Sequence, residues 1–247
     1  PGAMTGNKYC EGFSHRTMRV LLLMLPLCIC VALWAVYGNY DNFSSIRTMS
    51  REAVLESIRS FGADIRRVKD SGISSCQTLR MGGDYGGHRI CDHRPQQCTA
   101  LSFGIQQDWS FDSDLVDLWN CTVFAADPSV THPSNLYKGR VYFLQAAANT
   151  LEDAPSHWHM TTSVPSLRRW LKLDTLPLLK MDCEGCEYSL ASDVDAEEPD
   201  MWNKIQQFVV EIHVSKLWIS SFNHVHNLAL LWTQLREAGL KLVNVEQ

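Results

Sequence analysis

Three acidic side chains follow one strongly apolar run of the chain. The segment "LPLLKMDCEGCEYSL", Leu176–Leu190, is apolar until Asp182, and Glu184 and Glu187 come soon after it. Carboxylates at such a place can take a proton from a hydroxyl, stabilise a cation or ligate a hard metal ion. A solvated turn would also carry acids, so the other strand ends decide between these interpretations.

Other apolar runs end in polar residues as well. "SFGIQQDWSFD" carries Gly104 and then Asp108, "AADPS" carries Asp127, and "VVEIHV" carries Glu211 and His213. Glu211 and His213 are two residues apart, which predicts the same strand face for both. A single acid at a strand end is usually a cap or a turn residue, but acids that end several strands indicate a binding edge.

The elements that would position these residues alternate along the chain. Strands that alternate with helices predict a mostly parallel sheet with helices on both faces, and near-continuous apolar strands fit burial on both sides. In such a sheet, ligands bind beyond the carboxyl ends of the strands. We therefore predict an α/β, Rossmann-like fold. The predicted strands are 98–105, 121–127, 140–148, 175–182, 204–214 and 240–246, and the predicted helices are 112–120, 163–173 and 222–239.

The region before this alternation has two further features. Residues 44–69 are polar with apolar residues at helical spacing, and Ser50 is a plausible N-cap. We expect a stem helix there, or a first helix that packs on the domain. Met81–Cys98 is rich in glycine, which predicts a loop or a hairpin.

The most apolar segment lies near the beginning of the sequence. Residues 20–38 carry no charge and suffice to cross a bilayer as a helix; a cleaved signal peptide is the alternative. Basic residues precede the segment, which favours a cytoplasmic N-terminus and a lumenal domain. We predict a single-pass type II membrane protein of the Golgi or endoplasmic reticulum, divided as 1–19 cytoplasmic tail, 20–38 transmembrane helix, 39–75 stem and 76–247 domain.

Cysteine usage indicates an oxidising compartment. Six cysteines follow the apolar segment, and we expect Cys91 and Cys98 to form one bridge that closes a short loop. Cys183 and Cys186 form a C-x-x-C, a spacing also found in redox and zinc sites.

Composition and missing motifs exclude several function classes. The net charge of -5 shows no basic excess, so nucleic acid is not an expected partner. The sequence has no G-x-G-x-x-G, no P-loop and no G-x-S-x-G, which disfavours dinucleotide, kinase and serine hydrolase chemistry. A "DSD" at Asp112–Asp114 formally matches a glycosyltransferase D-x-D motif, although it opens a predicted helix.

The pattern resembles one family of enzymes. "LLKMDCEGCEYSL" is similar to a motif of FkbM-like class I methyltransferases, which use S-adenosylmethionine, and "LSFGIQQDWSFD" with "GGDYGGHRIC" resembles related membrane-anchored methyltransferase-like proteins. The resemblance covers about residues 76–247. It implies that Phe103, Gly104 and Gln106 line the methionine end of the cofactor. It also implies that Asp127 takes the ribose hydroxyls, near Asp108.

The resemblance implies chemistry for the remaining acids. Asp182 and Glu184 would face the sulfonium or the substrate, and the acceptor would be an oxygen, such as a hydroxyl of a glycan or of a lipid-linked acceptor. His213 is the candidate general base, with Asp182 and Glu211 as rivals. Alternatively, Asp182, Glu184, Glu211 and His213 would hold Mg²⁺ or Mn²⁺.

Two departures from the family keep other interpretations open. The usual glycine-rich loop is reduced to Gly104, and no residues remain after the strand expected at 240–246 to build the last antiparallel strand of the fold. A truncated chain or a non-catalytic, membrane-anchored module with the same fold is therefore an alternative, and a lumenal glycosyltransferase is another. The pairs His157/His159 and His224/His226 are expected at the surface.

Overall fold

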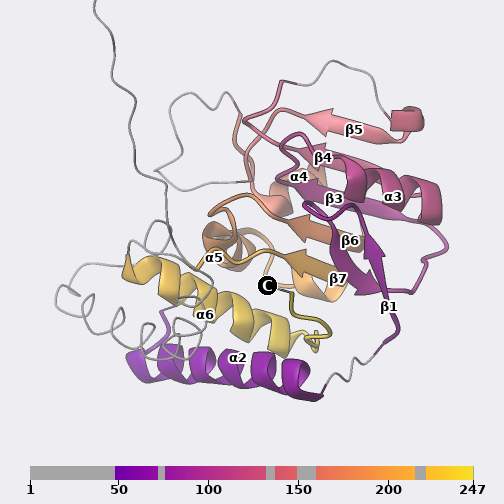
Figure 1. The fold of residues 1–247 in the computed structure, drawn as a ribbon. Helices are drawn as coiled ribbons and strands as arrows, with labels where there is room; N and C mark the ends of the chain where they lie inside the picture. Colours follow the sequence, from indigo (N-terminus) through magenta and orange to yellow (C-terminus); the bar gives the residue numbers. More distant parts are fainter. Residues whose placement is uncertain (1–47, 72–75, 132–136, 149–159, 215–220, 247) are drawn as a thin grey trace, which may run out of the picture. The chain divides into compact units, whose positions relative to one another are not determined.

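The centre of the molecule is a five-stranded parallel sheet. The computed structural model describes residues 48–71, 76–131, 137–148, 160–214 and 221–246. The strands pair in the order β5-β4-β3-β6-β7, and every pair is parallel (Figure 1). The fold is therefore α/β and Rossmann-like, as predicted. The strands are β3 (Thr99–Phe103), β4 (Thr122–Ala126), β5 (Val141–Leu144), β6 (Leu176–Met181) and β7 (Ile205–Val210).

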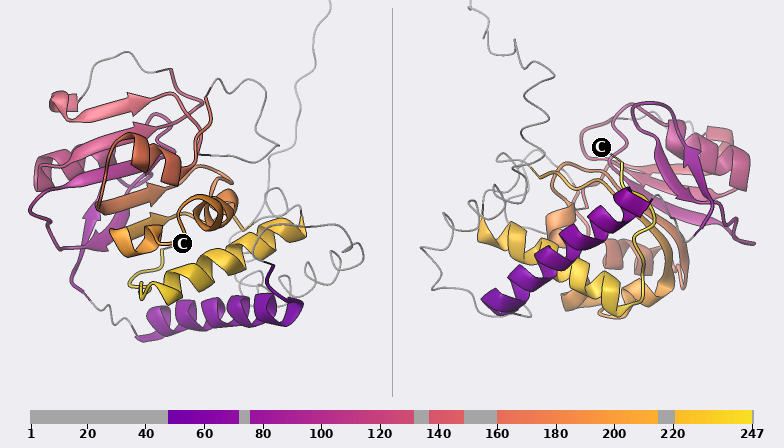
Figure 2. Two further views of the ribbon diagram at one scale, coloured as in Figure 1. Left: turned by 180° about the vertical axis from the view of Figure 1, so that it is seen from behind. Right: turned by 60° about the horizontal axis from the view of Figure 1, so that its bottom comes forward.

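Helices cover both faces of the sheet, which explains the apolar strands. Helix α3 (Ser110–Trp119) packs on one face, while α4 (Val164–Trp170), α5 (Glu187–Glu197) and α6 (Phe222–Glu237) cover the other (Figures 1 and 2). All six residues of β6 are buried, as double-sided coverage requires. The helices predicted at 112–120, 163–173 and 222–239 are thus confirmed, with α5 as an addition.

A two-stranded hairpin precedes the sheet in the chain. It pairs β1 (Thr78–Met81) with β2 (His88–Cys91), so the glycine-rich region is a hairpin. Met81 and Ile90 are buried and join the core on the α3 face. Short 3₁₀ turns at Tyr137–Gly139 and Met201–Lys204 lead into β5 and β7.

The first helix packs on the domain. Helix α2 (Arg51–Ser71) begins after Ser50, whose hydroxyl accepts a hydrogen bond from the Ala53 amide at 3.2 Å, which confirms the predicted cap. Figure 2 shows α2 against α6, where the rings of Phe61 and Trp232 lie 4.6 Å apart. The described residues, from 48 onward, form one compact unit. Of the two roles expected for this helix, packing on the domain is the one observed.

The prediction that His226 is solvated is wrong, and His224 is only partly exposed. His226 is buried at the start of α6, and its Nε2 accepts a hydrogen bond from the Met49 amide at 3.2 Å. His224 stacks on the ring of Tyr188, with 4.8 Å between the ring centres. The reason is that α2 and α5 cover the beginning of α6, where the sequence suggested an open helix end.

The strand predicted at 240–246 does not form. Leu240 and Leu242 pack against the core, so the apolar alternation is used for burial without backbone pairing. β7 is contacted by β2 instead, where the Gln207 side chain bonds both the amide and the carbonyl of Cys91. Among the described residues, the large sheet contains parallel strands only.

Three disulfides replace the predicted Cys91–Cys98 bridge, which is wrong. Cys91 pairs with Cys76, across the open end of the hairpin. Cys98 pairs with Cys121 because these residues immediately precede β3 and β4, whose first residues lie opposite each other. Cys183 pairs with Cys186 within the C-x-x-C. All six cysteines beyond the apolar segment are therefore oxidised.

Removal of the Cys98–Cys121 bridge is expected to cost about 3 kcal/mol of unfolding free energy. The bridge closes a loop with a sequence separation of 23, and longer loops constrain the unfolded chain more. A double Cys98→Ala, Cys121→Ala variant should show this loss in urea unfolding. The Cys183–Cys186 bridge spans three residues, so its double alanine variant should lose only about 2 kcal/mol. Equal losses would contradict the loop-length explanation.

Some predictions concern parts of the chain outside the described residues. These are the tail at 1–19, the span at 20–38, the stem before residue 48, and the surface positions of His157 and His159. Among the described helices, none has both the length and the apolar character needed to cross a bilayer.

Candidate functional site

A cavity of about 160 Å³ lies beyond the carboxyl ends of the central strands. The chain runs outward from β3 to β4 and β5, and then returns to the other side of β3 through β6 and β7. The change of direction falls between β3 and β6, where α/β sheets typically bind ligands. The cavity is lined by Tyr85, Gly86, Gly104, Ile105, Gln106, Asp108, Lys180, Asp182, Glu184, Glu211 and His213. The predicted site residues thus meet here, apart from Phe103 and Asp127.

Phe103 does not line this cavity. It is buried in β3 and packs with the residues beneath α4, α5 and α6. Since side chains alternate along a strand, the last residue of β3 points into the core and Gly104 is the first to reach the edge. The side chain that was expected at the methionine end of a cofactor is therefore a core residue.

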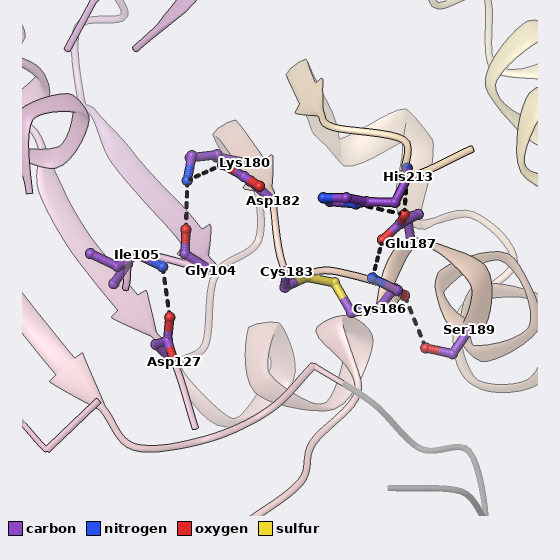
Figure 3. The surroundings of a disulfide bond; sticks show 11 residues. Gly104, Ile105, Asp127, Lys180, Asp182, Cys183, Cys186, Glu187, Ser189 and His213 are labelled. Atoms are coloured by element: carbon purple, nitrogen blue, oxygen red, sulfur yellow. Dashed lines mark hydrogen bonds and ion pairs between the residues drawn. A yellow bond between two sulfur atoms is a disulfide. The ribbon is translucent and has the colours of Figure 1, made fainter. Parts of the chain in front are cut away.

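Asp127 is also absent from the cavity lining, because its carboxylate holds the neighbouring loop. One oxygen accepts hydrogen bonds from the amides of Ile105 and Gln106, at 2.9 and 2.7 Å (Figure 3 shows the first). The other accepts bonds from the amide and hydroxyl of Ser129. Asp127 is 3% exposed. In this structure it fixes the loop after β3 and has no oxygen turned to the cavity.

The ends of β3 and β6 approach each other closely at Gly104. Its φ is +76°, and a Cβ placed there would lie 1.5 Å from the carbonyl oxygen of Asp182. The glycine is required here because two strand ends approach each other, at a position with positive φ. The carbonyl of Gly104 accepts a hydrogen bond from Lys180 Nζ at 2.8 Å (Figure 3).

Lys180 is a buried cation among acids. Its side chain is 4% exposed, and Nζ lies 3.6 Å from Asp182 Oδ2. Beneath the cavity, the carboxylate of Asp112 is almost completely buried, which raises its pKa, while the charge of Lys180 opposes the rise. Lys180 thus ties the ends of β3 and β6 together and compensates acids on both sides of it.

Asp182 and Glu211 are neighbouring carboxylates with opposite pKa shifts. Burial acts to raise the pKa of Asp182, but His88, 3.6 Å away, and Lys180 outweigh it and hold the pKa below its usual value. Burial and the charge of Asp182 raise the pKa of Glu211. A pair of carboxyl groups with separated pKa values is typical of acid–base sites.

The "DSD" acids of the glycosyltransferase interpretation serve the fold. Asp112 is 1% exposed within α3, and Asp114 accepts a hydrogen bond from the Gly82 amide at 2.7 Å. Neither acid lines the cavity. The motif therefore anchors the hairpin to α3 instead of presenting carboxylates to a nucleotide sugar.

The hairpin tip forms one wall of the cavity. Asp108 accepts hydrogen bonds from the amides of Gly86 and Ser110, at 3.0 and 2.9 Å, and bonds to Ser110 lower the pKa of Asp108. Gly83 donates to the Ser110 hydroxyl at 2.8 Å. These bonds hold Tyr85, which is 85% exposed, at the rim of the cavity.

The turn after β6 carries Glu184 into the cavity wall. Glu184 has a φ of +49°, and its side chain accepts a hydrogen bond of 3.3 Å from Gln106, whose φ is +47°. The Cys183–Cys186 disulfide closes this turn (Figure 3). The C-x-x-C therefore lies beside the cavity as a bridge that shapes the acidic turn.

His213 is held by the first two residues of α5. The Glu187 carboxylate, which is fully buried, accepts a hydrogen bond from the amide of His213 at 2.9 Å, and its Oε1 lies 3.0 Å from the ring Nδ1 (Figure 3). The Tyr188 hydroxyl donates to the carbonyl of His213 at 2.5 Å. On the other side of the ring, Nε2 lies 3.8 Å from Glu211 Oε1. β7 ends at Val210, so Glu211 and His213 follow the strand instead of sharing a strand face.

Sequence reasoning missed Lys180 and Tyr85, and it gave Glu187 no role distinct from those of the neighbouring acids. Lys180 and Glu187 belong to the "KMDCEGCE" string that carries the family resemblance, so their signal was present. Tyr85 follows two glycines in the hairpin tip, and its only sequence signal was the glycine-rich loop.

Three side chains of the site would suit a divalent cation. Asp182, Glu211 and His213 each offer a ligand atom, and these atoms lie within 4.8 Å of one another. Carboxylates and an imidazole would hold Mg²⁺ or Mn²⁺, which would polarise a bound hydroxyl. Glu184, which was predicted with them, is not part of this group. Lys180 already lies next to Asp182, which weakens the attraction of a second cation there.

Comparisons of the chain with protein-family models, curated proteins and solved structures find no match. The resemblance to FkbM-like methyltransferases therefore depends on the residues and motifs that carry it.

Proposed function

We propose that the protein is an S-adenosylmethionine-dependent methyltransferase that methylates a hydroxyl oxygen. One observation carries the proposal: a cavity rich in carboxylates lies at the point where the strand order of a Rossmann-like sheet reverses. That place is where sheets of this kind bind cofactors. The sequence motif that resembles FkbM-like methyltransferases contributes Asp182 and Glu184 to the cavity wall.

The charge of the cavity supports a cationic ligand. Its lining contains four carboxylates and one lysine, and the lysine is already bonded to Gly104 and paired with Asp182. The surplus of negative charge favours a sulfonium, which is the cation that the cofactor would bring, and it disfavours phosphorylated or sulfated ligands. The carboxylates are Asp108, Asp182, Glu184 and Glu211.

The residues present fit the cofactor at its sulfonium end. Asp182 and Glu184 would hold the cation, with Gly104 and Gln106 as the adjoining wall. The cofactor would supply an electrophilic methyl group. The cavity is smaller than the roughly 300–1,000 Å³ of typical small-molecule sites, and the carboxylate of Asp127 is occupied. The nucleoside would therefore extend beyond this cavity, with its ribose held by other groups.

We propose a glycan or a lipid-linked acceptor for the methyl group. Three disulfides among the described residues support maturation in an oxidising compartment, where glycans are abundant. Carboxylates also accept hydrogen bonds from sugar hydroxyls. An acidic glycan is a poorer choice than a neutral one, since four carboxylates already line the cavity.

The first test is calorimetric binding of S-adenosylmethionine to the full chain, with S-adenosylhomocysteine as a neutral comparison. We expect micromolar binding of the sulfonium. Asp182→Asn keeps the side-chain shape and removes its charge. It should therefore weaken the binding of S-adenosylmethionine at least about tenfold, and the binding of S-adenosylhomocysteine much less. The titrations are repeated with Mg²⁺ and with EDTA to find any dependence on a divalent cation.

Asp200→Asn is the matched control, because Asp200 is exposed and does not line the cavity. It should bind both ligands as the unaltered chain does. Absence of binding by a folded sample would remove the enzyme proposal. An equal loss of affinity for both ligands in Asp182→Asn would show that the carboxylate does not recognise the sulfonium.

A second candidate is a non-catalytic module that retains the fold. Two observations favour it: the Asp127 carboxylate is fully used within the protein, and the cavity is small. This candidate predicts no binding of either cofactor form by a folded chain, so the same titration separates the two proposals.

A further inference from the structure

Glu187 is a buried acid that the proposed chemistry has not yet used. It is the first residue of α5 and is completely excluded from solvent. Its Oε2 accepts a hydrogen bond from the Gly185 amide at 2.9 Å. Its Oε1 accepts one from the His213 amide and lies 3.0 Å from the ring Nδ1 of His213. The two backbone amides can only donate, and an ionised carboxylate can only accept, so the contact with the ring requires a proton on Nδ1.

This arrangement fixes which nitrogen of His213 carries the proton. A neutral imidazole has one N–H donor and one acceptor nitrogen. Nδ1 lies 3.0 Å from Glu187 Oε1, so the proton belongs on Nδ1. Nε2, on the other side of the ring and in the direction of Glu211, is then an acceptor. His213 lines the cavity, and a ring with this orientation can receive a proton there.

We propose that Glu187 is a positioning residue that holds His213 in the Nδ1–H tautomer, so that Nε2 serves as the base for a hydroxyl acceptor. The catalytic part of this inference rests on the proposed methyltransferase function. The acceptor's O–H bond breaks and its proton passes to Nε2. The acceptor oxygen bonds to the methyl carbon as the carbon–sulfur bond breaks, and sulfur leaves as a neutral thioether. The imidazolium that forms is stabilised by the Glu187 carboxylate.

The contacts of Glu187 and Tyr188 differ in whether they orient the His213 ring or only hold the His213 backbone. Tyr188 also holds the segment, but through the carbonyl of His213, without touching the ring nitrogens. Glu187 contacts both the backbone amide and the ring Nδ1 of His213. Removal of the Tyr188 hydroxyl should therefore loosen the segment and leave the tautomer unchanged, whereas neutralising Glu187 should alter the tautomer.

The test reads the tautomer directly and needs no cofactor. The full chain is labelled with ¹⁵N in its histidine rings, and long-range ¹H–¹⁵N correlation spectra are recorded at about pH 8.5, where ordinary histidines are neutral. The signals of His213 are identified by their loss in His213→Gln. We expect a protonated Nδ1 and an unprotonated Nε2. In Glu187→Gln the ratio of the Nδ1–H to the Nε2–H tautomer should fall by about tenfold or more.

Tyr188→Phe is the control variant and should keep the ratio of the unaltered chain. An Nε2–H tautomer in the unaltered chain would overturn the proposal, even if Glu187→Gln failed to fold. An unchanged ratio in a folded Glu187→Gln would overturn the role of Glu187. Because these spectra contain no methyl donor, a failure of cofactor binding leaves the tautomer result standing, and the two proposals can fail separately.

Discussion

Gly104→Ala should destabilise the protein by roughly 3–5 kcal/mol or prevent folding, and it should abolish ligand binding at the cavity. The added Cβ would lie 1.5 Å from the carbonyl oxygen of Asp182, so β3 and β6 cannot keep their positions. The conformation itself, with φ of +76°, adds a further cost for any residue with a side chain. Urea unfolding measures the loss.

Gly239→Ala is a matched control for this prediction. Gly239 has a φ of +77°, but a Cβ placed there meets nothing within 4 Å. It therefore carries the cost of the left-handed conformation alone, about 1 kcal/mol. If both variants lost the same stability, the close approach of the strand ends would not matter, and the description of this edge would be wrong.

Lys180→Met is expected to cost about 3 kcal/mol at pH 7. The side chain is buried, and its ammonium group faces Asp182 at 3.6 Å and compensates the buried Asp112. Methionine fills similar space but leaves these carboxylates without their cation, and uncompensated buried charge is strongly destabilising. Lys138→Met removes a lysine that pairs with Asp117 at the surface, so it should change stability by less than about 1 kcal/mol.

The loss in Lys180→Met should depend on pH with a defined sign. Burial already raises the pKa of Asp112, and Lys180 opposes that rise. Without the lysine the pKa of Asp112 rises further, so the folded variant binds a proton more readily than its unfolded chain. The difference between the variant and the unaltered protein should therefore shrink as the pH falls from 7 to about 5. A constant difference over this range would show that lost packing, and not charge, is responsible.

The sheet could be predicted from the sequence because its strands are short apolar runs separated by helices. Helix α5 could not, because "EYSLASDVDAE" has no apolar stripe. It is buried by its position between its neighbours, which include α4 and α6. The strand expected at 240–246 does not form for the opposite reason: the sequence alternates apolar and polar residues, but the apolar side chains pack on the core. Whether such a segment pairs with a sheet depends on which strand edges the rest of the chain leaves open.

The position of the candidate site could be predicted from the residues that end the strands, but the role of each acidic residue could not. The position of Asp127 at a strand end suggested a ligand contact, yet the amides of Ile105 and Gln106 use its carboxylate. Lys180 was overlooked because it lies inside a buried strand, and the particular role of Glu187 could not be read from the sequence. The Gly104 carbonyl and His213, which these side chains contact, come from other parts of the chain.

The packing of α2 on α6 also places the beginning of α2 on the cavity side of the sheet. Contacts pair Met49 with His226, Ser57 with Ala229 and Ser60 with Arg236, so the two helices run in the same direction. Helix α6 follows β7 and begins on the side of the sheet where the strands end, which is the side of the cavity. Residue 48, the first described residue, therefore lies on the same side of the sheet as the cavity.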